Sequence, residues 1–183
     1  MSIGEIWRKI AGAHRSDDQT EGAGVAEFFL PKFTVGFFIR AGVVALLAIL
    51  IFGFILRPCI INGASMLPNW PEHGFTFCWT LRYLFSPPRR GDVVIVRYSS
   101  KVFYLKRVVG LPGDTVAFWR GNLYVNGRRV KEPYVKYISN WNLRPRRVEP
   151  GHFYVVGDNR SQPIHVHKFG QVRASRIIGA PLF

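Results

Sequence analysis

Cysteine and acidic residues are both scarce in this 183-residue chain. The two cysteines, Cys59 and Cys78, have no neighbouring group of His or Cys, which excludes a zinc site with the usual ligand spacing. A disulfide between them requires an oxidising compartment, and two free thiols are the preferred interpretation. Internal repeats are lacking, and residues 58–183 show no helical periodicity of useful length. The C-terminal part is therefore not expected to be mainly helical.

The shortage of acidic residues leaves a large positive excess, with 25 Lys and Arg against 11 Asp and Glu and a formal net charge of +14. Residues 1–56 hold five side chains of each sign, so residues 57–183 carry 20 basic and 6 acidic groups. The whole excess lies in the C-terminal part. A surface this basic predicts an anionic partner, either nucleic acid or phospholipid head groups.

Only one long hydrophobic run is present, and it covers residues 41–56 between Arg40 and Arg57. If Arg40 snorkels to the interface, the apolar residues before it extend the run to 34–56, which can span a hydrocarbon core of roughly 30 Å. A cleavable signal peptide would begin nearer the N-terminus and end in a small-x-small site. We therefore predict a retained anchor, with the buried core helix of a soluble protein as the alternative. The flanking charges leave its orientation open.

The segments on either side of this run differ in composition. Residues 1–33 are polar and mixed and predict a flexible tail with one short helical stretch at 3–11. Beyond Arg57, short β-branched and aromatic runs alternate with turn residues, which is typical of antiparallel β structure. The proline-punctuated, basic segment 132–150 predicts an exposed loop. The strands are expected at 93–96, 102–109, 115–119, 123–125 and 153–156, with a further hairpin beginning at Asn126-Gly127.

Two residues of the C-terminal part suggest chemistry. Ser65 lies in the stretch I-N-G-A-S-M-L-P-N-W soon after the apolar run, and a serine hydroxyl is a poor nucleophile until a base takes its proton. Lys106 alternates with Tyr104 and Val108 along a predicted strand, so we expect it to be partly desolvated. Desolvation lowers the pKa of an ammonium group towards the range where the neutral amine acts as a base. Neither residue is diagnostic alone, because a strand lysine commonly protects an edge.

Five strings of the chain together resemble the type I signal (leader) peptidases, which are membrane-anchored Ser/Lys endopeptidases. They are S-M-L-P at 65–68, R-G-D-V-V-I-V at 90–96, K-R-V-V-G-L-P-G-D at 106–114, L-Y-V-N-G at 123–127 and G-D-N-R at 157–160. The resemblance implies a mainly β fold, with an antiparallel β-sheet catalytic domain of signal-peptidase type over 57–183 behind one N-terminal transmembrane helix.

By this resemblance Ser65 is the nucleophile and Lys106 the general base, and no cofactor or metal is implied. The Ser65 backbone N–H is implied to be one oxyanion donor. In many Gram-negative members a serine two residues before the nucleophile supplies a second donor, whereas this chain has Gly63 there. Asp158, Asn159 and Arg160 match a string whose polar side chains brace the site through hydrogen bonds and ion pairs.

The chain departs from the family directly after G-D-N-R. The family usually continues x-x-Ser-x-Asp-Ser-Arg-x-x-Gly, whereas this chain reads S-Q-P-I-H-V-H-K-F-G. Pro163 replaces the serine that orients the lysine, and His165 and His167 replace the aspartate and the arginine. We expect the two histidines to face one side of a strand and to form hydrogen bonds or ion pairs rather than bind a metal. The preferred interpretation is an active protein in which Ser161, His165 or another polar group holds Lys106. The alternative is a catalytically impaired protein.

The region after Ser65 contains an apolar and aromatic cluster, which suits a face dipping into the bilayer interface. Its members are Phe75, Phe77, Trp79, Leu81, Leu84 and Phe85. Together with anionic lipids attracted by the basic surface, this face would hold the catalytic pair at the membrane.

The function expected is removal of N-terminal signal peptides from exported preproteins by a single-pass protein of the inner (plasma) membrane, with its catalytic domain on the extracytoplasmic side. A membrane-tethered, basic nucleic-acid-binding β domain is the alternative from another class, but it leaves the anchor and the Ser/Lys pair unexplained, so no nucleic acid is expected. A self-cleaving repressor-type peptidase would need an N-terminal DNA-binding domain, for which a tail and an anchor leave no room.

Overall fold

The computed structural model describes residues 34–99, 102–167 and 170–182. The tail and the short helical stretch predicted within residues 1–33 lie outside the described residues. The chain divides after Leu47, and the β-rich unit begins at Ala48.

The apolar run forms a helix, α3, over Val35–Leu50, followed by a π-helical turn, η1, over Ile51–Ile55. Together they make a 21-residue apolar segment that is long enough to cross a membrane. None of the residues Val35–Leu50 is buried. This argues against the alternative of a soluble core helix, whose residues would be covered by protein.

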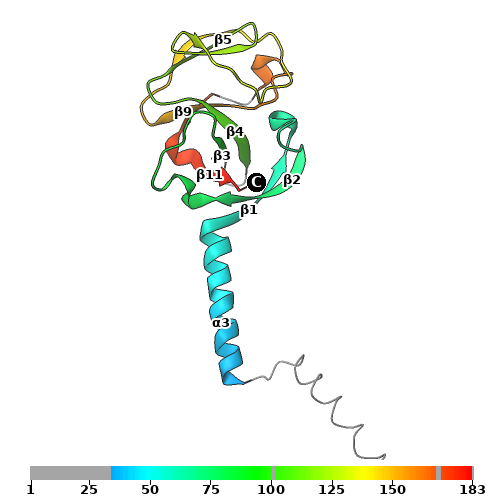
Figure 1. Ribbon diagram of the computed structural model, residues 1–183, viewed down its shortest axis with the longest axis vertical. Helices are drawn as coiled ribbons and strands as arrows, with labels where there is room; N and C mark the ends of the chain where they lie inside the picture. Colours follow the sequence, from blue (N-terminus) through cyan, green and yellow to red (C-terminus); the bar gives the residue numbers. More distant parts are fainter. Residues whose placement is uncertain (1–33, 100–101, 168–169, 183) are drawn as a thin grey trace, which may run out of the picture. The chain divides into compact units, whose positions relative to one another are not determined.

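A seven-stranded antiparallel sheet forms the larger part of the β-rich unit (Figure 1). In spatial order its strands are β1 (Leu56–Asn62), β2 (His73–Trp79), β11 (Ile177–Pro181), β3 (Val93–Arg97), β4 (Phe103–Gly110), β9 (His152–Val156) and β10 (Gly170–Arg173). Short 3₁₀ turns connect them: η2 (Ala64–Met66), η3 (Thr80–Tyr83), η4 (Ile164–Val166) and η5 (Ala174–Arg176).

A four-stranded antiparallel sheet forms the rest, in the order β7 (Arg128–Arg129), β6 (Asn122–Val125), β5 (Thr115–Trp119) and β8 (Leu143–Arg147). The turn between β6 and β7 contains Asn126 and Gly127, which both take positive φ. Positive φ at two successive residues is what a type I′ hairpin turn requires, and Asn-Gly is its favoured pair. The hairpin predicted at this position is therefore confirmed.

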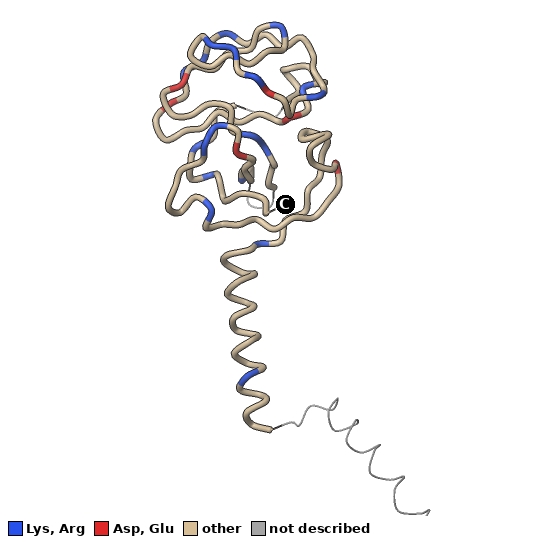
Figure 2. Tube along the Cα trace, viewed as in Figure 1, with Lys and Arg blue, Asp and Glu red and all other residues tan. Residues whose placement is uncertain are grey.

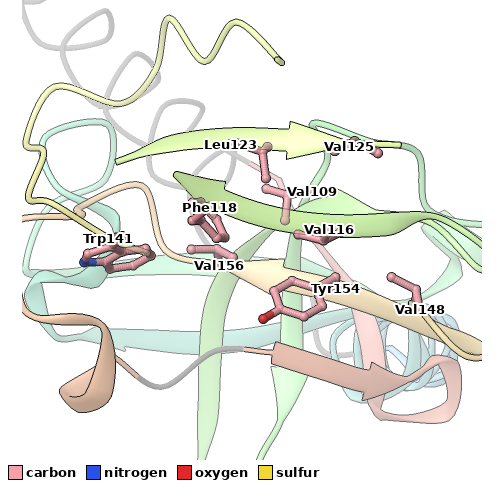
Figure 3. Packing of buried hydrophobic residues seen from close by; sticks show 9 residues of the cluster. All are labelled: Val109, Val116, Phe118, Leu123, Val125, Trp141, Val148, Tyr154 and Val156. Atoms are coloured by element: carbon pink, nitrogen blue, oxygen red, sulfur yellow. The ribbon is translucent and has the colours of Figure 1, made fainter. Parts of the chain in front are cut away.

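The main hydrophobic core lies between the two sheets (Figure 3). Val116 and Phe118 of β5 pack there against Val109 of β4 and Val156 of β9. A second buried cluster includes Val108 and Val155, which alternate with the residues of the first, so β4 and β9 contribute to both cores. This double burial explains why their sequences are nearly continuous hydrophobic runs.

The five strands expected from the sequence are all present, with ends shifted by two residues at most. The expectation of one exposed loop over 132–150 was wrong. That segment contains strand β8, and Trp141 and Val148 within it are buried in the main core. Cys59 on β1 and Cys78 on β2 are free thiols, the first half-buried and the second buried.

Phe118 and Trp119 are adjacent on β5 but face opposite sides of the sheet, with exposed fractions of 1% and 58%. We predict that Phe118→Ala lowers the free energy of unfolding by about 3–5 kcal/mol, because it leaves a cavity in the main core. Trp119→Ala is the matched control and should cost less than about 1 kcal/mol. Urea unfolding of the full chain in detergent, followed by circular dichroism, measures both. Equal losses would contradict this description of the core.

Candidate active site

The structure places Ser65 and Lys106 on the wall of one cavity of about 260 Å³. Ser65 lies in the turn η2 and Lys106 in the middle of β4. Tyr104, Asn159 and His167 line the same cavity. The two residues singled out from the sequence therefore share one small space, although β2 and β3 separate them along the chain.

Lys106 is 3% exposed, so the desolvation expected for this side chain is confirmed. Its Nζ lies 5.7 Å from the centre of the Tyr104 ring. Burial disfavours an ammonium charge relative to the neutral amine, which is the form that can accept a proton. The position of Lys106 on β4 therefore suits it to act as a base.

Arg107, the next residue, points to the other side of β4 and binds Asp158 through two hydrogen bonds, Nε to Oδ1 at 2.8 Å and Nη2 to Oδ2 at 2.6 Å. Burial by itself lowers the pKa of Arg107, but the hydrogen bonds and the charge of Asp158 outweigh it and raise that pKa. Asp158 has no exposed surface and accepts a third bond from Asn69. The ion pair fixes β4 against the segment that follows β9.

Arg160 is 1% exposed and also holds this segment. Its Nε donates to the carbonyl of Gly157 at 2.6 Å, and its Nη2 lies 2.7 Å from a carboxylate oxygen of Glu132. Buried charges are tolerated when they are paired and hydrogen-bonded, as these are. The bracing roles implied for Asp158 and Arg160 thus have a physical basis in this chain.

Asn159 holds the backbone carbonyls on both sides of the Ser65 Cα. Its backbone N–H donates to the Ser65 carbonyl at 3.0 Å, and its side-chain Nδ2 donates to the Ala64 carbonyl at 2.9 Å. The Ala64 carbonyl and the Ser65 N–H belong to one planar trans peptide and point in opposite directions. Fixing the carbonyl therefore also fixes the direction of the Ser65 N–H.

Two glycines permit this arrangement. A Cβ on Gly157 would overlap the Ser65 carbonyl oxygen, so only glycine allows the two backbones to approach so closely. Gly63 has a φ of 119°, a conformation that residues with side chains rarely adopt. A serine at position 63, the second oxyanion donor in other members, would strain this backbone.

The two histidines do not face one side of a strand, so that expectation was wrong. Residues Ile164–Val166 form the 3₁₀ turn η4 instead, because Pro163 precedes them and its ring cannot donate to a strand ladder. His165 is exposed and does not line the cavity, and the Ser161 hydroxyl donates to Asn159 Oδ1 at 2.7 Å. Of Ser161, His165 and His167, only His167 lies on the cavity wall together with Lys106.

His167 is half-buried, and its ring packs edge-on against Trp141 at 4.7 Å between centroids. Burial lowers its pKa from 6.5 to about 4, and the charge of Arg160 acts in the same direction. His167 is therefore neutral at physiological pH. Its Nε2 lies 2.7 Å from the Asn159 carbonyl, which can only accept, so Nε2 carries the proton. The hydrogen bond expected for His167 is therefore confirmed, although the segment before it forms a 3₁₀ turn and not the strand that sequence reasoning predicted.

A second, narrower cavity of about 30 Å³ adjoins Ser65. Its wall includes the apolar residues Ile61, Met66, Ile95 and Leu105 together with the polar residues Asn62 and Thr76. A cavity of this size and lining admits only a small group. Among the described residues, no cluster of three or more His, Cys, Asp or Glu side chains could hold a metal ion.

A hydroxyl, a buried amine and an oriented backbone N–H at one cavity are the groups that nucleophilic acyl transfer requires. The family described as "Signal peptidase, peptidase S26" matches residues 35–183. Signal peptidase I of Bacillus caldolyticus is 34% identical over 140 residues, which are 69% of this chain and 77% of that protein.

Signal peptidase I of Bacillus licheniformis is 34% identical over 161 residues, covering 79% of this chain and 85% of the relative. A crystal structure of a signal peptidase I from Enterococcus faecalis V583 is 26% identical, with a TM-score of 0.43, and covers 52% of this chain and 97% of that one. The family match spans most of the sequence and includes both Ser65 and Lys106. This chain belongs to the S26 family of signal peptidases.

Proposed function

We propose that this protein is a membrane-bound serine endopeptidase that removes signal peptides from exported preproteins, with Ser65 as nucleophile and Lys106 as general base. The observation that carries the proposal is the shared cavity, where the Ser65 turn meets a lysine that is 3% exposed. Relatives that cover more than two thirds of this chain are named signal peptidase I, which points to the substrate class.

The reaction begins when the neutral amine of Lys106 takes the proton of the Ser65 hydroxyl as its oxygen attacks the scissile carbonyl. The resulting ammonium gives that proton to the departing amine, which leaves an acyl-enzyme on Ser65. Water, deprotonated by the same amine, then releases the signal peptide. Burial of Lys106 supports this role, because a solvated lysine would stay charged at neutral pH.

The tetrahedral intermediate carries a negative oxygen, and the donor proposed to stabilise it is the Ser65 N–H. Asn159 acts here as a positioning residue, because its side chain fixes the Ala64 carbonyl at the other end of the same peptide. His167 in turn donates to the Asn159 carbonyl and holds that residue from the far side. Hydrogen bonds thus lead from His167 through Asn159 to the peptide that joins Ala64 to Ser65.

Substrate choice follows from the narrow cavity next to Ser65. Its volume of about 30 Å³ suits a small side chain at the residue before the cut. Signal peptides end in small residues at such sites. A bulky residue there would not enter without moving Met66, which is 2% exposed.

The apolar cluster predicted to meet lipid lies on β2, on η3 and directly after η3, and most of its side chains are exposed, Leu84 by 63% and Phe85 by 91%. It adjoins η1, because Phe77 packs against Phe52 and the Thr80 hydroxyl donates to the Phe54 carbonyl. Exposed aromatic residues next to the end of an apolar segment support a membrane interface, with Val35–Ile55 as the anchor. Placing the catalytic unit on the extracytoplasmic side completes the proposal.

The mechanism predicts that Ser65→Ala and Lys106→Met each reduce kcat/KM for a preprotein by at least about 10³-fold, because each removes one half of a unit that works only as a pair. Ser175→Ala and Arg173→Ala are controls at exposed positions and should retain full activity. Purified full chain in detergent, with processing followed on gels, provides the measurement. Equal processing by all variants would discard the mechanism, and no processing even by the wild type would indicate a catalytically impaired relative.

The positioning role of Asn159 predicts that Asn159→Ala lowers kcat by about 10²-fold with little change in KM, as expected when an oxyanion contact is lost. His167→Phe keeps the packing against Trp141 but removes the Nε2–H, and should show the same pattern to a smaller extent. Asn140→Ala, at an exposed position, is the control.

If Asn159 had a purely structural role, its substitution would lower stability and substrate binding and would not affect kcat selectively. Affinity for a peptide boronate, which forms a tetrahedral adduct on serine, distinguishes the positioning role from the structural one. In the Asn159→Ala variant it should fall by the same factor as kcat. Unchanged boronate affinity in a folded variant would refute the positioning role.

The membrane contact predicts that Leu84→Ser/Phe85→Ser slows preprotein processing several-fold in liposomes, because the exposed apolar cluster no longer enters the interface. Cleavage of a short peptide in detergent should stay at the wild-type rate. Ile138→Ser removes an apolar side chain of similar exposure (64%) elsewhere and is the control. An equal effect in liposomes and detergent would argue against lipid contact.

A further inference from the structure

The small sheet carries a concentration of positive charge that the proposed reaction does not use. Residues 115–147 contain eight basic side chains and one acidic side chain. All eight basic residues are exposed: Arg120, Arg128, Arg129, Lys131, Lys136, Arg144, Arg146 and Arg147. Figure 2 shows these cations along the small sheet and its connections. The one acid, Glu132, is already bound to Arg160 at 2.7 Å.

Within the described parts of the chain, none of these eight cations forms an ion pair with a carboxylate. Their charge is therefore left for a partner. Six of the eight are arginines, whose planar guanidinium groups bind carboxylates through paired hydrogen bonds.

A groove on the outer face of this sheet accompanies the charge. It has a volume of about 720 Å³, and its wall includes Trp119, Tyr124, Leu143, Pro145 and Arg144. Trp119 is 58% exposed, and the guanidinium of Arg120 lies 5.8 Å from its ring centre. A ligand that suits this groove therefore has both apolar side chains and negative charge.

The location of the groove argues against lipid as its ligand, because a bilayer would lie beside η1 and β1. In Figure 1, β4 and β9 lie between β5 and β1, so the small sheet occupies the other end of the β-rich unit. The groove is nevertheless linked to the catalytic cavity. His167 on the cavity wall packs against Trp141, and Trp141 packs against Phe118, a residue that also lines the groove.

We propose that the outer face of β5, β6 and β8 binds an acidic, partly apolar stretch of the preprotein on the carboxyl side of the cut. This inference rests on the proposed function, because a chain held at Ser65 continues past the unit and presents its downstream residues at a high effective concentration. Acidic downstream segments are then favoured and basic ones repelled. The small sheet selects among substrates that have equally good cleavage sites.

The test uses one signal peptide followed by downstream segments that are rich in Asp and Phe, in Ser and Phe, or in Lys and Phe. With the full-length wild type in a zwitterionic detergent, KM should be about tenfold lower for the acidic than for the neutral segment, the sum of a few exposed ion pairs. The turnover number should be the same for both. The difference should shrink in 0.5 M salt, which screens exposed charges.

Arg144→Glu/Arg146→Glu should abolish the advantage of the acidic segment. Arg173→Glu/Arg176→Glu reverses the same number of exposed charges on β10 and η5, away from the small sheet, and is the matched control that should retain the advantage. Equal KM values for acidic and neutral segments with the wild type would overturn the proposal. An equal loss in both double variants would also overturn it, since the effect would then be a general attraction to a basic protein.

Two further outcomes distinguish this inference from lipid binding at the same surface and from a failure of the proposed function. In one outcome, Arg144→Glu/Arg146→Glu binds vesicles of anionic lipid more weakly than the wild type and the control do, while KM is the same for acidic and neutral segments. The surface then binds lipid, and the proposal is wrong. If no substrate is cleaved at all, the proposed function fails, and binding of the acidic segment to the protein, measured by fluorescence anisotropy, decides the inference by itself. Wild-type binding that Arg144→Glu/Arg146→Glu abolishes would support it, and no binding would overturn it.

Discussion

The two hydrogen bonds from Asn159 to the carbonyls of Ala64 and Ser65 hold together segments that are far apart in the sequence. Neither segment has regular structure long enough to fix its own position. The turn η2 has three residues, and the backbone after β9 leaves the sheet at Gly157. Their mutual position therefore depends on this contact, on the glycine that permits it, and on the buried Arg107–Asp158 pair that attaches the second segment to β4. Lys106 stands on that same strand, so the supports of Ser65 and of Lys106 meet at adjacent residues.

The sequence predicted the strands that contribute to one or both cores, because β-branched runs bounded by Gly, Asn and Asp leave few other structures available. It did not predict β1, β2, β8, β10 and β11, for physical reasons that differ. β1 follows the apolar run directly and contains Pro58, so its pattern merges with the anchor. β8 has the sequence Leu-Arg-Pro-Arg-Arg, in which four residues are exposed. Such an edge strand is specified by its partner β5 and not by its own composition.

The same distinction applies to the site. Ser65 and Lys106 were found because their surrounding strings resemble a known family, and the burial of Lys106 followed from strand alternation. The surroundings of His167 could not be predicted in this way, because alternation assumes a strand that Pro163 prevents. Its contact with Trp141 was equally hidden, since the segment that carries Trp141 reads as a polar loop and is fixed only by long-range packing. Local pattern thus indicated the two candidate catalytic residues, and tertiary contacts specified what surrounds them.

The two ends of the β-rich unit differ in their exposed side chains, and this difference suits them to different partners. Exposed apolar side chains gather on β2 and η3 beside η1, whereas residues 115–147 carry eight cations and a single acid that is already paired. The small sheet combines its cations with an apolar groove, whereas the residues beside η1 offer exposed apolar side chains to a bilayer interface. The apolar end suits lipid near the anchor, and the basic end suits a ligand that reaches the unit from the aqueous side, such as the chain on which Ser65 is proposed to act.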